Sequence, residues 1–124
     1  MENTIVWFDI PVKDLKRAKS FYQTVLKIEL QEMEGPDGNK RAFFPFGPGV
    51  ASGCLVEAHA PLYEVSVKGP VIYLNGGKDL SEPLARVVEA GGKVTMEKFS
   101  IGEFGRIARF IDTEGNQIAL HSPN

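Results

Sequence analysis

His121 and Asp9 are the side chains of this sequence best suited to move a proton. Histidine titrates near neutral pH, so an imidazole beside a substrate can serve as a general base or as a hydrogen-bond partner. In a strand over 117–121, period-two alternation places His121 on the same face as Gln117 and Ala119. If that face lines a hollow, His121 reaches a ligand there. The alternative is a half-exposed histidine near the end of the chain with no chemical role.

Asp9 is expected to share a strand face with Trp7, two residues earlier. A carboxyl group held beside an indole inside a hollow is poorly solvated, which favours its protonated form and suits it to acid–base chemistry. The alternative is that Asp9 lies near the end of its strand and caps a nearby backbone amide. His121 and Asp9 are therefore the candidate catalytic residues.

Three further side chains could bind a metal or attack a substrate. Glu57 and His59 form an E-x-H pair, and two residues so spaced on one strand share a face, as a metal site or an acid–base pair requires. They fall where a strand gives way to a polar connection, which favours solvated side chains. Cys54 is the single cysteine, and free cysteine is most often buried, so we interpret it as core packing.

Aromatic side chains are frequent, and several alternate towards one face of their strands. Such a set could form an apolar, stacking pocket for a planar or hydrophobic ligand, and it could equally fill a core. Trp7, Phe43 and Tyr73, together with Gln117, are the candidate ligand-binding residues. The other aromatic candidates are Phe99, Phe104 and Phe110.

These candidates must be positioned by a strand, a helix and three more strands in the first half of the chain. β-Branched and aromatic residues fill 4–10, and Pro11 is expected to end that strand because it cannot donate to a ladder. A helix follows, with Asp14 as its N-cap and apolar residues at spacings of three and four. Turn-forming residues then separate three strands near 28–34, 41–46 and 52–57.

The second half of the chain has the same order of elements. A polar connection over 58–69 leads to a strand over 71–75 and a helix over 79–90, which stops at Gly91-Gly92. Three more strands are expected over 93–99, 106–111 and 117–121.

The two halves form an internal repeat. Lys13-Asp14-Leu15 recurs as Lys78-Asp79-Leu80, and RAFFPF from Arg41 aligns with RIARFI from Arg106, both with a shift of 65 residues. The repeat predicts one domain of the α+β class. Its two βαβββ modules, over 1–58 and 70–124, would form a curved mixed sheet around a cleft. Arg41 and Arg106 would then offer related guanidinium groups to an anionic substrate, unless they are solvated strand ends.

Composition and charge exclude several classes of protein. The 124 residues are 43% hydrophobic and 24% charged, as in one globular domain, and no run approaches the roughly 18 apolar residues of a membrane span. The net charge of −2 provides no surplus for binding phosphates, so nucleic acid is not an expected partner. The lone cysteine and an N-terminus without the basic region and apolar run of a signal peptide indicate the cytoplasm.

The sequence resembles the vicinal oxygen chelate superfamily over nearly its whole length. VWFDIPVKDLKRAKSFYQTVL is similar to the family's strand and V-x-D-L…FY…LG helix, and FGRIARFIDTEGNQIAL to its F-x-D-P-x-G-N strand-turn-strand. Thr113 and Lys27-Ile28 depart from that pattern, where proline and leucine-glycine are usual. The resemblance implies two βαβββ modules that enclose a pocket, completed in a homodimer.

Metal-dependent members of that family hold a divalent ion with His, Gln or Glu on the first and last strands of each module. The resemblance places these positions at Trp7, at Val71 or Ile72, at Ala119, and at Cys54 one repeat before Ala119. Of this set only Cys54 has a side-chain lone pair that can bind a metal. No metal cofactor is therefore expected.

The resemblance implies a protein similar to glyoxalases and bleomycin resistance proteins that binds a small, partly apolar metabolite or toxic compound in an aromatic-lined cleft. Trp7 and Tyr73 would stack on this ligand, and Asp9 and His121 would orient its polar groups.

Two alternatives stay open. One is a metal-dependent lyase or isomerase of the glyoxalase I type, with a divalent ion held by Glu57, His59 or His121. The other is a non-catalytic dimerisation or regulatory module whose hollow is filled by its own side chains.

Overall fold

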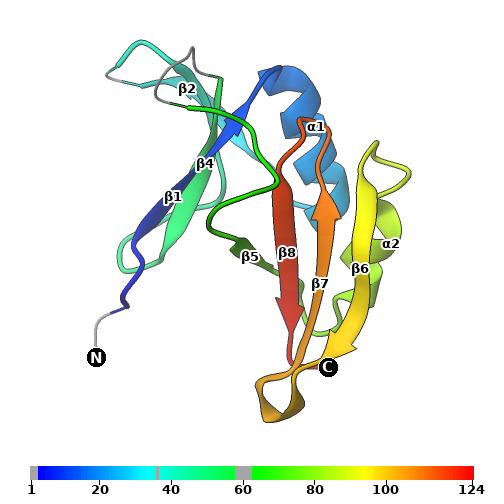
Figure 1. Cartoon of the computed structure of the whole chain (residues 1–124). Coiled ribbons are helices and arrows are strands. Elements are labelled where there is room, and N and C mark those ends of the chain that lie inside the picture. The colour runs from blue at the N-terminus through cyan, green and yellow to red at the C-terminus, as the bar shows by residue number, and fades with distance from the viewer. Residues whose placement is uncertain (1–2, 36, 58–62) are drawn as a thin grey trace.

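The computed structural model describes residues 3–35, 37–57 and 63–124. These residues form two βαβββ modules, each a four-stranded mixed sheet with a helix beside it (Figure 1). The elements of the first module are β1 (Trp7–Val12), α1 (Leu15–Leu26), β2 (Gln31–Glu34), β3 (Lys40–Phe43) and β4 (Ser52–Glu57). Those of the second are β5 (Ile72–Asn75), α2 (Ser81–Arg86), β6 (Lys93–Ser100), the 3-10 turn η1 (Gly102–Phe104), β7 (Arg106–Ile111) and β8 (Gln117–Ser122).

The two sheets have the same topology. Sheet A has the order β1-β4-β3-β2 and sheet B the order β5-β8-β7-β6. Strand β1 runs parallel to β4, and β5 runs parallel to β8. The predicted α+β fold of two βαβββ modules is confirmed. The prediction of one continuous curved sheet is wrong, because within the described residues no ladder joins the edge strands β1 and β5.

Helix α1 packs against both sheets. Its Tyr22 ring lies 5.7 Å from Phe44, which follows β3, and its Phe21 ring lies 5.7 Å from Phe110 of β7. All four side chains are buried in one hydrophobic cluster that includes residues of both modules. Phe110 therefore belongs to the core and not to a ligand-binding hollow, because it points from β7 towards the helix.

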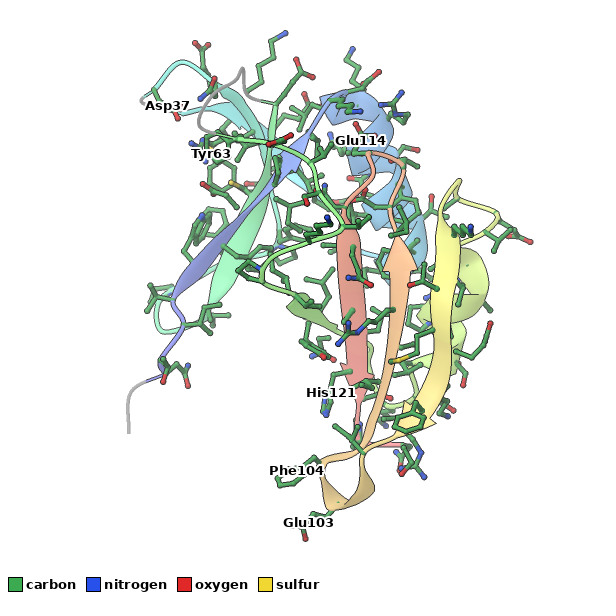
Figure 2. All side chains as sticks on the ribbon, in the orientation of Figure 1. Asp37, Tyr63, Glu103, Phe104, Glu114 and His121 are labelled. Carbon is green, nitrogen blue, oxygen red and sulfur yellow. The ribbon has the colours of Figure 1, made fainter. Side chains whose placement is uncertain are left out.

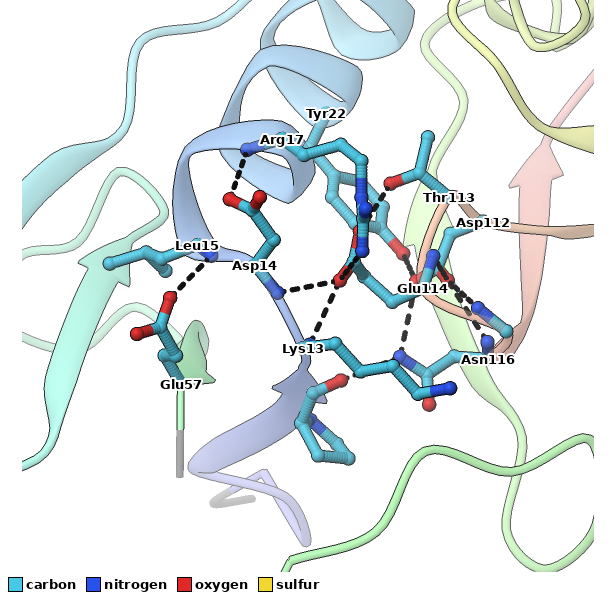
Figure 3. A network of polar contacts seen from close by, with 12 residues as sticks. Lys13, Asp14, Leu15, Arg17, Tyr22, Glu57, Asp112, Thr113, Glu114 and Asn116 are labelled. Carbon is cyan, nitrogen blue, oxygen red and sulfur yellow. Dashed lines mark hydrogen bonds and ion pairs between the residues drawn. The ribbon is translucent and has the colours of Figure 1, made fainter. Parts of the chain in front are cut away.

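The N-terminus of α1 is fixed by the opposite module. The predicted N-cap is confirmed, since Asp14 Oδ1 accepts from the Arg17 amide at 3.1 Å. Glu114, in the turn between β7 and β8, accepts from the amides of Lys13 and Asp14, each at 2.8 Å (Figure 3). The Arg17 guanidinium donates to the same carboxylate at 2.7 and 2.9 Å. With the Thr113 hydroxyl, which donates at 2.8 Å, five donors converge on this one buried side chain.

Asp112 and Asn116, on either side of Glu114, also bind the first module. We call these three residues the clasp. The Tyr22 hydroxyl donates to Asp112 Oδ2 at 2.6 Å, and Asn116 Nδ2 donates to the Pro11 carbonyl at 2.7 Å. Burial, and then Asp112, raise the pKa of Tyr22 well above its ordinary value. The clasp therefore ties β1 and α1 of the first module to the turn of the second.

Some predicted boundaries were wrong. Pro11 lies within β1 and does not end it, because β1 is an edge strand and tolerates a residue without an N–H. Helix α2 is shorter than the predicted 79–90, since the backbone continues as turns from Val87 to Gly91, which has a φ of 105°. No helix of the described ranges is long and apolar enough to cross a membrane.

Candidate functional site

One face of sheet A gathers several of the candidate residues. The register pairs Asp9 of β1 with Cys54 of β4, and Cys54 with Phe43 of β3. Side chains at paired positions lie on the same face of a sheet, and so do residues two apart on one strand, which adds Trp7 and Arg41 to this set. Helix α1 packs on the opposite face, against β3 and β4. The five side chains therefore lie on the face of sheet A that no helix of the described ranges covers.

Three aromatic rings on this face contact one another. The ring centroids of Trp7 and Phe43 are 5.7 Å apart, those of Trp7 and Phe46 are 6.5 Å apart, and those of Phe43 and Phe46 are 5.8 Å apart. Trp7 is 39% exposed and Phe46 is 54% exposed. We call these three residues the aromatic patch. Exposed aromatic clusters of this kind mark binding surfaces.

Asp9 forms hydrogen bonds with four side chains around it. Its carboxylate accepts from Trp7 Nε1 at 3.2 Å and from the Tyr63 hydroxyl at 2.8 Å. Arg41 Nη1 and Cys54 Sγ each donate to it at 3.3 Å. Asp9 and Trp7 share a face, as predicted, whereas the described contacts of Asp9 include no backbone amide that it would cap. With all these donors engaged, Asp9 holds the site together and positions the indole of Trp7.

Arg41 links the carboxylate of Asp9 to that of Asp37, to which Arg41 Nη2 donates at 2.7 Å. It also donates to Cys54 Sγ at 3.3 Å. Burial raises the pKa of the Cys54 thiol to about 11, and Asp9 contributes in the same direction against the opposing effect of Arg41. The thiol is therefore protonated at neutral pH and is a poor nucleophile or metal ligand. Its complete burial agrees with the interpretation of Cys54 as a packing residue.

The remaining candidates lie on sheet B, away from this group. His121 is a residue of β8 and Tyr63 lies over sheet A, and the two are well separated in Figure 2. His121 is not at a frayed end, since β8 pairs with β5 and with β7. Its Nε2 lies 2.6 Å from the Phe104 carbonyl oxygen, which only accepts, so Nε2 carries a proton. Gln117 Nε2 donates to the Val67 carbonyl at 3.1 Å.

Tyr73 belongs to a row of three residues across sheet B. It pairs with Ala119 of β8, which pairs in turn with Arg109 of β7. Arg109 Nη2 donates to the Tyr73 hydroxyl at 3.3 Å, so the contact spans the fully buried Ala119. Tyr73 also lines a cavity of about 1080 Å³ between the modules, as do Val71 and Ile72, whereas Trp7, Asp9, Phe43, Gln117 and His121 are not among its lining residues.

The pairing of Arg41 with Arg106 through the repeat is wrong. Arg41 shares the uncovered face of sheet A, whereas Arg106 shares the face of β7 that carries the buried Ala108 and Phe110. A shift of one residue moves a side chain to the other face of a strand, so the alignment of this segment is one residue out. The arginine of β7 on the uncovered face is Arg109.

The E-x-H pair does not form a site in the described ranges. Glu57 Oε2 accepts from the Leu15 amide at 2.7 Å, so this side chain caps the first turn of α1 (Figure 3). His59 lies outside the described residues. The position of Glu57 at the end of a strand was predicted, but its helix-capping role depends on a contact between elements that the local pattern does not contain.

The residues at the family's metal positions do not fit a divalent ion. Trp7 and Ala119 carry no metal-binding group, and Cys54 is protonated and bonded to its neighbours. Ile72 packs against the core, so Val71 is the residue on the face of Tyr73, and it has no lone pair to donate. Within the described ranges, no group of three or more His, Cys, Asp or Glu residues could hold a metal ion.

Tyr63, Phe46 and Arg109 are the site residues that the sequence did not indicate. Tyr63 lies in a connection without periodicity, which gives no signal for its contact with Asp9. Phe46 lies beyond the end of β3, in a loop that brings it back over Trp7. Arg109 could have been found, because strand alternation places it on the same face as Ile107 and Ile111.

The fold and these two sheet faces define a protein of the vicinal oxygen chelate type. The chain belongs to the Glyoxalase/Bleomycin resistance protein/Dioxygenase superfamily, whose family model matches residues 4–120. Among curated proteins it is similar to "Putative glyoxylase CFP32" of Mycobacterium bovis and of Mycobacterium tuberculosis. Each is 27% identical over 126 residues, which cover 99% of this chain and 47% of the relative. The chain thus spans about half the length of these curated relatives.

Solved structures of the family superpose on most of the chain. The antibiotic binding protein TnmS3 from Streptomyces sp. CB03234 is 26% identical with a TM-score of 0.66, and the match covers 98% of this chain and 97% of TnmS3. A glyoxalase/bleomycin resistance protein from the same organism is 27% identical with a TM-score of 0.66, covering 96% and 100% of the two chains. A glyoxalase-related enzyme from Fulvimarina pelagi, at 12% identity and a TM-score of 0.71, covers 97% and 88% and shares the fold.

Proposed function

We propose that this protein binds a small, partly apolar compound through the aromatic patch and does so without a metal ion. The observation that carries the proposal is the mutual contact of Trp7, Phe43 and Phe46 on a face that no helix covers. Such rings offer stacking surfaces to a planar ligand. The likeness to TnmS3, described as an antibiotic binding protein, supports a toxic compound or antibiotic as the kind of ligand.

A homodimer would complete this site. In one chain Tyr73, Gln117 and His121 lie on sheet B, apart from the aromatic patch on sheet A. We propose that sheet B of a second copy lies against sheet A, so that Tyr73 also stacks on the ligand and His121 orients its polar groups. The exposure of 46% for Tyr73 and 39% for Trp7 supports this, because large aromatic surfaces are commonly covered in an assembly.

We also propose that the protein works in the cytoplasm. The support is its single cysteine, Cys54, which can form no intramolecular disulfide. This location stays a prediction.

Binding should change the fluorescence of Trp7, the only tryptophan. A planar quencher such as 4-nitrobenzyl alcohol should quench it in a saturable way, and Phe46→Ala should weaken the apparent affinity about tenfold, because it removes roughly 1.4 kcal/mol of aromatic contact. Val88→Ala, which removes an exposed apolar side chain next to α2, is the control and should leave the affinity unchanged. Quenching that rises linearly in all three proteins would contradict the proposal.

Divalent metals should not stabilise the chelator-stripped protein. A metal present at about a hundred times its dissociation constant would add roughly 2.7 kcal/mol, a shift of several degrees in a domain of this size. We expect melting temperatures within about 1 °C of the metal-free value with nickel, zinc, manganese or ferrous iron. Stabilisation by one of them, with about one equivalent in the untreated protein, would instead favour a metal-dependent lyase of the glyoxalase I type.

A further inference from the structure

Arg109 is a cation without a described counter-ion on the uncovered face of sheet B. The ion pairs within the described ranges involve Arg17, Lys19, Arg41 and Lys98, and Arg109 is in none of them. Its Nε is buried and has no hydrogen-bond partner among the described residues. Because a guanidinium has five N–H donors and no acceptor, a buried N–H without a partner is costly.

The comparison with Arg41 shows what is special about this position. Arg41 also has a buried Nε without a described partner, but its charge is neutralised by Asp9 at 3.3 Å and Asp37 at 2.7 Å. The described polar partner of Arg109 is a neutral phenol, the Tyr73 hydroxyl at 3.3 Å. The two modules therefore place an arginine on corresponding faces. In the second module no described acidic side chain neutralises its positive charge.

Tyr73 adds a second donor at the same place. Its hydroxyl oxygen accepts from Arg109 Nη2, so its own proton is free to be donated. Between the two side chains lies Ala119, a small, fully buried residue that the Arg109–Tyr73 contact spans. A guanidinium and a phenol that converge over a small residue match the oxygens of a planar anion, because a guanidinium can bind a carboxylate with two parallel hydrogen bonds.

We propose that Arg109 and Tyr73 bind the acidic group of the ligand, and that the ligand is an aromatic carboxylate. This inference rests on the proposed function, since the aromatic patch would hold the apolar body while sheet B of a second copy binds the carboxylate. The aromatic patch alone would accept a neutral ligand, whereas this proposal requires a ligand with a negative charge. The guanidinium of Arg109 lies beside Ala119, the position at which metal-dependent members of the family carry a metal ligand.

The test uses two probes that differ mainly in charge, 2-naphthoate and 2-naphthylmethanol, in calorimetric titrations of the full chain. We expect the wild-type protein to bind 2-naphthoate at least tenfold more tightly than the alcohol. Arg109→Gln should weaken the binding of 2-naphthoate at least tenfold and leave that of the alcohol unchanged, and Tyr73→Phe should weaken 2-naphthoate several-fold. Arg106→Gln, on the other face of the same strand, is the matched control and should change neither affinity.

The outcomes separate this inference from the proposed function. If both probes bind equally and Arg109→Gln changes neither affinity, the anion site is wrong and the aromatic binding site stands. If neither probe binds the wild-type protein, both proposals fail. Sedimentation velocity should show a dimer for the wild type and for Arg109→Gln. If Arg109→Gln dissociates the dimer and weakens both probes equally, Arg109 pairs with an acid of the second copy and the assignment to the ligand is wrong.

Discussion

The substitution Glu114→Gln is expected to lower the free energy of unfolding by about 3 kcal/mol at pH 7. The Glu114 side chain is fully buried and accepts five hydrogen bonds, two from the Arg17 guanidinium, two from the amides of Lys13 and Asp14, and one from the Thr113 hydroxyl. Glutamine has no negative charge, and its side-chain NH2 group would face the N–H groups that now donate to the carboxylate. Breaking a buried ion pair costs about 3–5 kcal/mol, and the half-exposed Arg17 places this one at the lower end.

Urea denaturation measures this loss, and the melting temperature should fall by about 10 °C. Glu103→Gln is the matched control, because Glu103 is an exposed glutamate in the turn η1 at the far end of sheet B (Figure 2). Its substitution should stay within about 0.5 kcal/mol of the wild type. A loss below about 1 kcal/mol for Glu114→Gln would show that the clasp does not hold the modules together.

The pH dependence of stability gives an independent measure of the same contact. Burial opposes ionisation of Glu114, but the hydrogen bonds from Arg17, the Asp14 amide, Thr113 and the Lys13 amide outweigh it and hold its pKa at about 2, below the ordinary 4.5. A carboxyl group with a depressed pKa stabilises the fold above its unfolded pKa and loses that contribution as the pH falls. The wild-type protein should therefore lose stability between about pH 4.5 and pH 2, and Glu114→Gln should lose less over that interval.

Local periodicity predicted the elements well because the signals were strong. The apolar stripe of α1 and the N-cap Asp14 are both present, and the alternation that places Trp7 and Asp9 on one face is confirmed. These features depend on spacings of two, three and four residues, which the sequence displays directly. The order of elements in the two modules followed from the same spacings and from the repeat.

The relation between the modules could not be predicted in this way. It depends on α1, whose Phe21 and Tyr22 contact both sheets, and on Glu114, which the sequence showed only as a turn residue. Contacts between residues about 100 positions apart leave no local pattern. The same reason explains why Tyr63 was missed, and why the local pattern did not show that the candidates of the two modules lie on separate sheets.

The repeat was informative about order but not about register. With a slip of one residue between β3 and β7, Arg41 corresponds to Ile107 and not to Arg106, which lies on the opposite face, and the alignment gave no indication of Arg109, two residues after Ile107 on the uncovered face. The register changes the chemistry of the site, since it places the guanidinium of Arg109, and not that of Arg106, beside Tyr73. Site predictions from repeats thus need the register as well as the order of elements.

The substitution Gly53→Ala is expected to cost about 3 kcal/mol, because it would force β1 away from β4. A methyl group at Gly53 would lie 2.4 Å from the Phe8 carbonyl oxygen and 2.5 Å from two atoms of the Phe8 ring. These two residues are paired in the parallel ladder, so the carbonyl cannot move without its strand. Overpacking of this kind costs about 1–3 kcal/mol where side chains give way, and a backbone contact places it at the upper end.

Because β1 carries Trp7 and Asp9, the same substitution should also weaken quenching of Trp7 by 4-nitrobenzyl alcohol at temperatures where the variant is folded. Gly47→Ala is the matched control, since a methyl group there meets no atom within 4 Å and the backbone is not left-handed. It should change the free energy of unfolding by less than about 0.5 kcal/mol. Equal urea midpoints for the two variants would mean that β1 and β4 separate without cost, and that the close approach at Gly53 does not hold the aromatic patch in place.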